Sequence, residues 1–114
     1  MQTKKEHTNS QTLHLAYKVV EGANRINTHN LLRHELAKTK VIYLLTQQGH
    51  KVISEAIFEN KSRCDILDLT TGTIYEILES EKLVDAKTKE VYYPPIFGIY
   101  YLQSTEVMNE EFDL

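Results

Sequence analysis

Apolar and polar residues alternate along the chain in a pattern that separates one long helix from several shorter elements. Apolar residues recur at spacings of three and four from about His29 to Gln48, which predicts a helix over this range. Asn27 or Thr28 fits the N-terminal cap, and Gly49 fits the C-terminal stop. The apolar residues cover a narrow face early and nearly the whole surface late. We therefore expect the C-terminal half of this helix to be its buried half.

The remaining apolar stretches are shorter and richer in β-branched and aromatic residues, which favours strands. The predicted strands cover residues 51–58, 63–70, 73–80 and 96–103. Residues 12–21 fit a short helix that ends at Gly22, and the polar segment 81–89 fits either a short helix or a loop. The order of these elements predicts an α/β or α+β fold built in layers.

Composition supports one small domain, residues 1–114, with a polar leader at 1–11 and an acidic tail at 105–114. The net charge is -3, whereas proteins that bind duplex DNA usually carry a basic surplus. The tail contains Glu and Asp residues but no Lys or Arg, so the acidity is partly local. Net charge thus weakens an interpretation as a nucleic-acid-binding protein without excluding it.

The sequence also indicates a compartment. No apolar run approaches the ~20 residues that a membrane-spanning helix needs, and the polar start has no signal-peptide pattern. The single cysteine, Cys64, has no partner for an internal disulfide and fits a small buried residue. We therefore expect a cytoplasmic protein without a membrane segment.

Two of the predicted strands form a hairpin around a short turn. Thr71 and Gly72 suit a two-residue turn, because glycine tolerates the positive φ that such turns require. In this register Thr70 lies opposite Thr73. A turn that is one residue longer would change which side chains share a face of the hairpin.

Carboxylates on this hairpin are the main candidates for chemistry. With the two-residue turn, Asp65 and Glu76 share a face as diagonal neighbours, roughly 7–8 Å apart at Cα. With the longer turn, Asp65 would share a face with Ile77 and Glu79 instead. Carboxylates among apolar neighbours are costly without a partner, and a divalent cation is one such partner. Glu35, on the preceding helix, is a candidate third oxygen ligand.

Four short motifs occur in a characteristic order: RHELA at 33–37, QGHKVI at 48–53, RCDIL at 63–67 and IYEI at 74–77. In order and spacing they resemble the PD-(D/E)xK nuclease superfamily, which has the restriction-endonuclease-like fold. The archaeal-type Holliday junction resolvases are the nearest pattern. The resemblance covers roughly residues 29–104 and implies an α/β fold with a central mixed β-sheet flanked by helices.

The resemblance also implies a function. It assigns metal binding to Glu35, Asp65 and Glu76, with Mg²⁺ or Mn²⁺ as the cofactor. The implied reaction is metal-dependent hydrolysis of phosphodiester bonds in DNA, either duplex or branched. Because resolvase-like proteins act as symmetric pairs on two strands, the resemblance also implies a homodimer.

One residue departs from the family pattern. The triplet lysine, which would stabilise the charge that develops on the phosphate, is replaced by Leu78. Lys38, three positions after Glu35, and Lys82, after the hairpin, are the candidate substitutes. The alternative is a catalytically inactive nuclease-fold module that binds nucleic acid or a protein partner. A third hypothesis is a small structural α/β protein whose carboxylates are incidental.

Other polar and aromatic residues fit ordinary structural positions. We expect Asp68 and Glu79 at the surface and Glu55 facing solvent. Lys82, Lys87 and Lys89 form a modest basic cluster that fits a solvated loop better than a phosphate site. The tyrosines fit a core edge or a dimer interface better than base stacking. These are Tyr92, Tyr93, Tyr100 and Tyr101.

Overall fold

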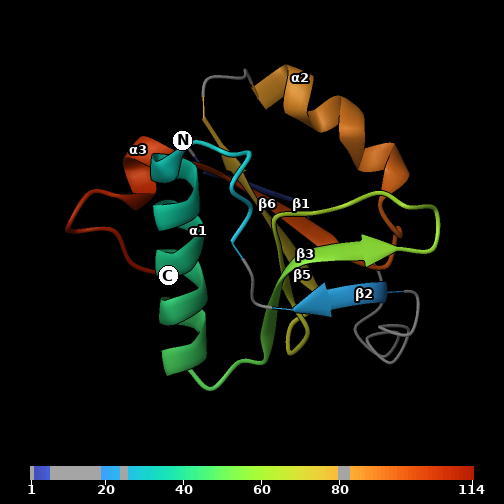
Figure 1. The fold of residues 1–114 in the computed structure, drawn as a ribbon, viewed down its shortest axis with the longest axis horizontal. Coiled ribbons are helices and arrows are strands. Elements are labelled where there is room, and N and C mark those ends of the chain that lie inside the picture. Colours follow the sequence, from blue (N-terminus) through green and yellow to red (C-terminus); the bar gives the residue numbers. More distant parts are fainter. Residues whose placement is uncertain (1, 6–18, 24–25, 80–82) are drawn as a thin grey trace.

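The structure, a computed structural model, describes residues 2–5, 19–23, 26–79 and 83–114 (Figure 1). It gives the backbone of the first two segments and both backbone and side chains of the others. The elements are β1 (Gln2–Lys5), β2 (Val19–Ala23), α1 (Leu32–Gln47), β3 (Val52–Phe58), β4 (Ile66–Asp68), β5 (Thr73–Leu78), α2 (Leu83–Lys87), the 3₁₀ helix η2 (Thr88–Tyr92), β6 (Gly98–Gln103) and α3 (Ser104–Val107).

The strands form one mixed sheet in the order β1-β6-β5-β4-β3-β2. Strands β5 and β6 are parallel, and the other neighbours are antiparallel. Helices α1 and α3 pack on one face of the sheet, whereas α2 packs on the other (Figure 1). The predicted α/β class, with a mixed sheet flanked by helices, is therefore confirmed at this coarse level.

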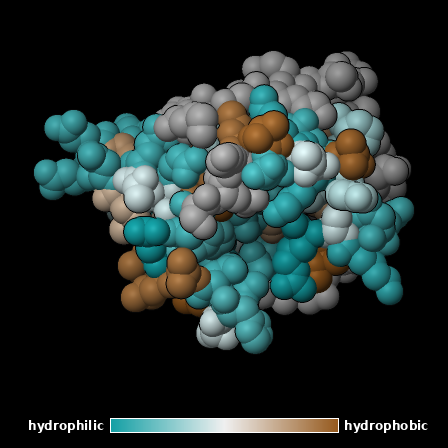
Figure 2. All heavy atoms as spheres, turned by 90° about the horizontal axis from the view of Figure 1, so that it is seen from above, coloured by the Kyte–Doolittle hydropathy of each residue, from teal (hydrophilic) through white to brown (hydrophobic). Residues whose placement is uncertain are grey.

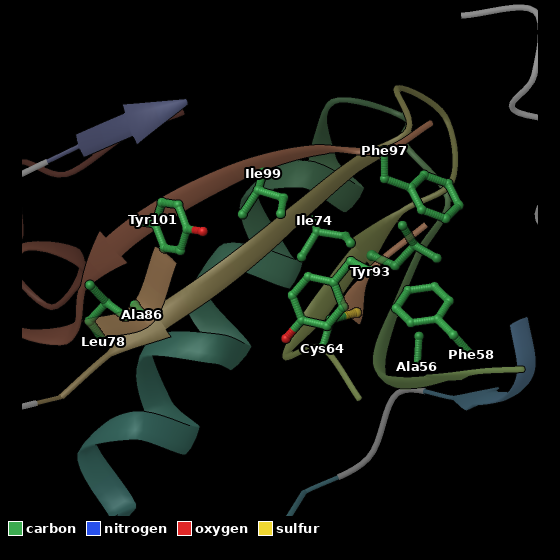
Figure 3. Close-up of a cluster of buried hydrophobic side chains, with 11 residues drawn as sticks. Ala56, Phe58, Cys64, Ile74, Leu78, Ala86, Tyr93, Phe97, Ile99 and Tyr101 are labelled. Atoms are coloured by element: carbon green, nitrogen blue, oxygen red, sulfur yellow. The ribbon is translucent and has the colours of Figure 1, made fainter. Parts of the chain in front are cut away.

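Each face of the sheet buries its own apolar cluster. On the α1 face, Ala37, Val41 and Leu45 of the helix pack against Ile66 and Ile77 of the sheet. The opposite face buries an aromatic-rich cluster under α2 and the segment before β6 (Figure 3). Its labelled members are Ala56, Phe58, Cys64, Ile74, Leu78, Ala86, Tyr93, Phe97, Ile99 and Tyr101. Cys64 is buried there, as predicted. Among the described residues that are visible from above, most of the surface is hydrophilic, with separate apolar patches (Figure 2).

The N-terminal predictions were wrong where the structure describes this part of the chain. Gln2–Lys5 of the predicted polar leader instead pairs with β6 as an edge strand. Val19–Ala23 pairs with β3, so residues 19–21 are not helical, and the rest of the predicted helix over 12–21 lies outside the described residues. A short segment without strong periodicity takes the structure that its pairing partner imposes, and the partner is distant in sequence.

Helix α1 begins later than predicted and buries a different half. It starts at Leu32 rather than His29, and it ends before Gly49, whose φ of +87° fits the predicted C-terminal stop. In its N-terminal half the polar side chains of His34, Glu35 and Lys38 are buried. The expectation that the C-terminal half is the buried one was therefore wrong. Apolar periodicity does not detect polar side chains that are buried with ionic partners.

The β4–β5 hairpin has a longer turn than predicted. Asp68 pairs with Thr73, so Leu69 to Gly72 form the turn, and Gly72 has a φ of +72°. The Asp68 side chain sets this turn because its Oδ1 accepts hydrogen bonds from the backbone N–H groups of Thr70 (2.9 Å) and Thr71 (3.3 Å). Asp68 is therefore fully buried rather than exposed.

Glu55 interrupts the regular alternation of β3. Its φ is +54°, a left-handed conformation that is uncommon for residues other than glycine. Ile53 packs on the α2 face, and beyond the interruption Ala56 and Phe58 also pack there. The Glu55 carboxylate consequently reaches Lys38 on the α1 face. The predicted solvent-facing position of Glu55 was wrong, since only 2% of this residue is exposed.

Candidate functional site

A cavity of about 350 Å³ opens where α1, the β4–β5 hairpin and the α2–η2 segment meet. Its walls carry both acidic and basic side chains, which the secondary structure brings together from distant parts of the sequence. The lining residues are Asn30, His34, Arg63, Asp65, Glu76, Ile77, Leu78, Glu79, Ala86, Lys89, Tyr93 and Tyr101. This concentration of ionisable groups makes the cavity the main candidate site.

Asp65 and Glu76 lie directly beyond the last β4–β5 residue pair, which is Ile66 with Tyr75. Extending the observed register by one pair places them directly across from each other rather than on a diagonal. Each carboxylate accepts a hydrogen bond from the other strand. The Asp65 N–H donates to Glu76 Oε2 (3.0 Å), and the Ile77 N–H donates to Asp65 Oδ2 (2.8 Å). The carboxylates thus replace the ladder hydrogen bonds where the strands diverge.

Burial raises the pKa of Glu76 well above its ordinary value, and the nearby charge of Asp65 raises this pKa further. The Tyr93 hydroxyl donates a hydrogen bond to Glu76 Oε1, which acts in the opposite direction. The same hydroxyl lies 3.1 Å from the Arg63 carbonyl oxygen. Tyr93 therefore anchors Glu76 from the α2 face of the sheet.

His34 connects the hairpin carboxylates to helix α1. Its Nδ1 lies 3.0 Å from Glu35 Oε2, and its Nε2 lies 3.1 Å from the Ile77 carbonyl oxygen and 3.4 Å from Asp65 Oδ2. Both ring nitrogens face oxygens that can only accept a hydrogen bond, unless a carboxyl group is protonated. This geometry favours the doubly protonated imidazolium. Burial alone would lower the pKa of His34, but Asp65 and then Glu35 outweigh it and raise the pKa to about 9.

Glu35 and Lys38 form a buried ion pair on α1. Lys38 Nζ lies 2.7 Å from Glu35 Oε1, and 1% of Lys38 and 4% of Glu35 are exposed. The Asn27 N–H and the Asn30 side-chain amide also donate to the Glu35 carboxylate, at 2.7 and 2.9 Å. Burial alone would raise the pKa of Glu35, but Lys38 and these hydrogen bonds lower it to about 2.

Glu55 is the second acidic partner of Lys38. Its Oε2 lies 3.5 Å from Lys38 Nζ, and its Oε1 lies 3.4 Å from Arg63 Nη1. The Asn27 side-chain amide also donates to Oε1, at 3.0 Å. One connected polar network therefore runs from the Asn27 segment through α1 and β3 to the cavity.

The structure brings together only some of the predicted site residues. Asp65 and Glu76 face each other, whereas Glu35 reaches Asp65 only through His34. The Lys38 ammonium lies between two carboxylates and does not line the cavity. Lys82, the other predicted substitute lysine, lies outside the described residues.

Leu78, at the position where the resemblance predicts a lysine, is buried in the apolar cluster beneath α2, although it also borders the cavity. Sequence reasoning missed four residues that take part in the site: His34, Arg63, Lys89 and Tyr93. Arg63 had a detectable signal, because residues two apart on an extended chain point to the same side and Asp65 was already a candidate. Lys89 and Tyr93 are distant in sequence from the hairpin, so only the fold places them here.

The donor set fits a divalent cation at the hairpin pair. Among the described residues, no group of three or more histidine, cysteine or carboxylate side chains is arranged as a metal site. The opposed carboxylates of Asp65 and Glu76 nevertheless supply hard oxygen donors, which Mg²⁺ and Mn²⁺ prefer, and a cation would offset the burial and the Asp65 charge that disfavour ionised Glu76. The Glu35 oxygens are engaged by Lys38, asparagine and His34.

Comparisons with protein-family models, curated proteins and solved structures gave no match to this chain. Within the described part of the chain, no helix is both long and apolar enough to cross a membrane.

Glu35 and His34 predict two pH-dependent contributions to stability, one at each end of the pH range. Glu35 has a lowered pKa, so its contribution is complete above pH 4.5 and is lost as the pH falls toward 2. His34 has a raised pKa, so its contribution is complete below pH 6.5 and is lost as the pH rises through 9. Each shift corresponds to at most about 3 kcal/mol.

Urea denaturation between pH 3 and 9, in the presence of a chelator, should therefore show the Glu35 contribution being lost below about pH 4.5 and the His34 contribution being lost above about pH 6.5, when each variant is compared with the wild type. Glu35→Gln should flatten the acidic limb of this profile, and His34→Gln should flatten the alkaline limb. A wild-type profile that is flat over the whole range would contradict both assignments.

Proposed function

We propose that this domain is a divalent-cation-dependent nuclease with a restriction-endonuclease-like fold, acting on phosphodiester bonds in DNA. The observation that supports the proposal is the direct opposition of Asp65 and Glu76 at the wall of a cavity that Arg63 and Lys89 also line. Two carboxylates with cationic groups beside them match the needs of a metal ion and a phosphate in one site.

Asp65 and Glu76 would hold the Mg²⁺ or Mn²⁺ ion. When bound, such an ion lowers the pKa of a coordinated water and polarises the phosphate. The protein supplies the orientation: His34 fixes Asp65, and Tyr93 fixes Glu76. Glu35 would not bind the ion directly. It hydrogen-bonds to His34, which in turn contacts Asp65, so it orients the site through His34.

Arg63 and Lys89 take the role of the missing triplet lysine in this nuclease. Both line the cavity with the carboxylates, so they are placed to bind phosphate oxygens and stabilise the charge that develops on them. Lys38 is assigned a supporting role, because its ammonium is engaged by Glu35 and Glu55 inside the protein.

The alternative function is a catalytically inactive module with the same fold that binds nucleic acid or a protein partner. Two observations favour it. Leu78 packs in the apolar cluster where the family has its lysine, and the protonated His34 already compensates the charge of Asp65 without a metal ion. Metal-dependent cleavage separates this alternative from the nuclease.

The test is incubation of the protein with Mg²⁺ or Mn²⁺ and labelled single-stranded, duplex and four-way-junction DNA. The comparison is between the wild type, Asp65→Ala, and Asp85→Ala as a matched control at an exposed position on α2. We expect cleavage by the wild type and the control, and a loss of at least roughly 100-fold in Asp65→Ala.

Other results identify the competing explanations. Equal products from the wild type and Asp65→Ala would indicate a contaminating nuclease and contradict the assignment of Asp65. No cleavage of any substrate would favour the inactive module. A homodimer, which the family resemblance implies, predicts symmetric cuts in two strands of the junction and twice the monomer mass in light scattering.

A further inference from the structure

A second hollow, of about 360 Å³, adjoins the carboxylate cavity and shares Arg63, Lys89 and Tyr93 with it. It lies between the turn after β3 and the 3₁₀ helix η2, which are on the α2 side of the sheet. Because the two hollows share these residues, they lie next to each other on the surface. We call the second hollow the basic groove.

The basic groove carries positive charge. Lys61, Arg63 and Lys89 line it, and none of its described lining residues is acidic, although the Glu55 carboxylate, outside the lining, lies 3.4 Å from Arg63 Nη1. This local surplus contrasts with the overall charge of -3. The groove holds three cationic side chains, and the adjoining cavity holds the two opposed carboxylates. This arrangement fits an anionic polymer that lies along the groove and brings one backbone phosphate to the proposed cation site.

An exposed aromatic ring borders the same groove. Tyr92 is 60% exposed, whereas the neighbouring Tyr93 is 8% exposed and belongs to the apolar cluster. A ring with one open face beside cationic side chains is the combination with which proteins bind unpaired bases. A base inside a duplex is already stacked on its neighbours, so this platform selects single strands.

The groove is held in a defined shape. The Asn60 side-chain amide and the Ser62 hydroxyl both donate to the Tyr92 carbonyl oxygen, at 2.6 and 3.0 Å, and so fix the turn against η2. Lys61 has a φ of +70°, and its N–H donates to the Phe58 carbonyl oxygen at 2.8 Å. Strained backbone of this kind persists where the surrounding structure over-determines it, and it is frequent at binding sites.

We infer that the basic groove binds single-stranded nucleic acid, with phosphates at Lys61, Arg63 and Lys89 and a base stacked on Tyr92. Single-stranded nucleic acid would then be the substrate class of the carboxylate cavity, and only the hydrolysis that follows binding rests on the proposed function. DNA and RNA strands share this chemistry. Binding itself requires neither the divalent cation nor hydrolysis.

The test is fluorescence anisotropy of a labelled single strand of about 12 nucleotides, as DNA and as RNA, with a chelator present. The double variant Lys61→Gln/Lys89→Gln should bind about tenfold more weakly or worse, and its log–log salt slope should fall by about 1.4. Tyr92→Ala should lose roughly fivefold to tenfold in affinity, and Tyr92→Phe should bind normally. Lys51→Gln, at an exposed lysine outside the groove, is the matched control.

Three results would overturn the inference: a duplex of equal length that binds as tightly, an unchanged affinity in the double variant, or a polyglutamate peptide that competes as well as an unlabelled strand. The last result would indicate recognition of charge alone. Strand binding without metal-dependent cleavage would support the binding role of the groove and contradict the nuclease proposal. Cleavage that depends on Asp65 but is unchanged by substitution of Lys61 and Tyr92, which line the groove and not the carboxylate cavity, would support the nuclease proposal and contradict the groove assignment.

Discussion

Replacing Lys38 by methionine is expected to lower the free energy of unfolding by about 3–5 kcal/mol, a large share of the stability of a small domain. The Lys38 ammonium lies 2.7 Å from Glu35 and 3.5 Å from Glu55, and all three side chains are buried. Methionine fills similar space but leaves two carboxylates without this cation. An unpaired buried charge costs more than the ion pair itself contributes, which is why the expected loss is large.

The measurement is urea denaturation of the wild type, Lys38→Met, Glu55→Gln and the double variant. The double variant should regain part of the lost stability, because it removes one of the two carboxylates that Lys38→Met leaves without this cation. Lys51→Met, at an exposed lysine, should change stability by less than about 0.5 kcal/mol. A loss below about 1 kcal/mol in Lys38→Met, with no coupling to Glu55, would show that the network is not a determinant of stability.

Replacing Glu76 by glutamine is expected to stabilise the metal-free protein and to abolish its response to Mg²⁺. Glu76 is held near Asp65, and burial and the Asp65 charge both disfavour its ionised form. A neutral amide removes this repulsion and can still hydrogen-bond to Asp65. The expected gain is roughly 0.5–2 kcal/mol at pH 7, the range typical of substitutions that relieve strain at a functional site.

Thermal denaturation with a chelator and with Mg²⁺ tests both parts of this prediction. The wild type should melt at higher temperature when Mg²⁺ is added, because a ligand that binds only the folded state stabilises it. Glu76→Gln should melt higher than the wild type in chelator and show no further gain with Mg²⁺. Glu110→Gln, at an exposed position near the C-terminus, is the control. A variant that is less stable than the wild type in chelator would contradict the prediction.

Together these two predictions assign opposite roles to neighbouring carboxylates. Glu35 and Glu55 are compensated inside the protein by Lys38, so they contribute to stability. Glu76 opposes Asp65 at the cavity wall, and burial and the Asp65 charge disfavour its ionised form, so this carboxylate is retained at a cost. A carboxylate that is costly to ionise and lines a cavity is a reason to expect function there.

The hairpin illustrates how far sequence reasoning could go. Alternating apolar residues and Gly72 located the two strands, and the convergence of Asp65 and Glu76 followed from pairing. The two-residue turn was nevertheless wrong, because Asp68 closes a four-residue turn with its own side chain. The carboxylates meet by a different register from the predicted one, and only long-range pairing distinguishes the two registers.

By itself the sequence determined the positions of α1, β3 and the hairpin, the stop at Gly49 and the burial of Cys64. Periodicity and turn chemistry are local, so these features depend on residues close in sequence. Only the tertiary structure decided that Lys38 and Glu55 are buried as partners, that His34 bridges Glu35 to Asp65, and that Lys89 lines the cavity. The free energy of a buried charge depends on its partners, and here these lie on separate elements that only the fold brings into contact.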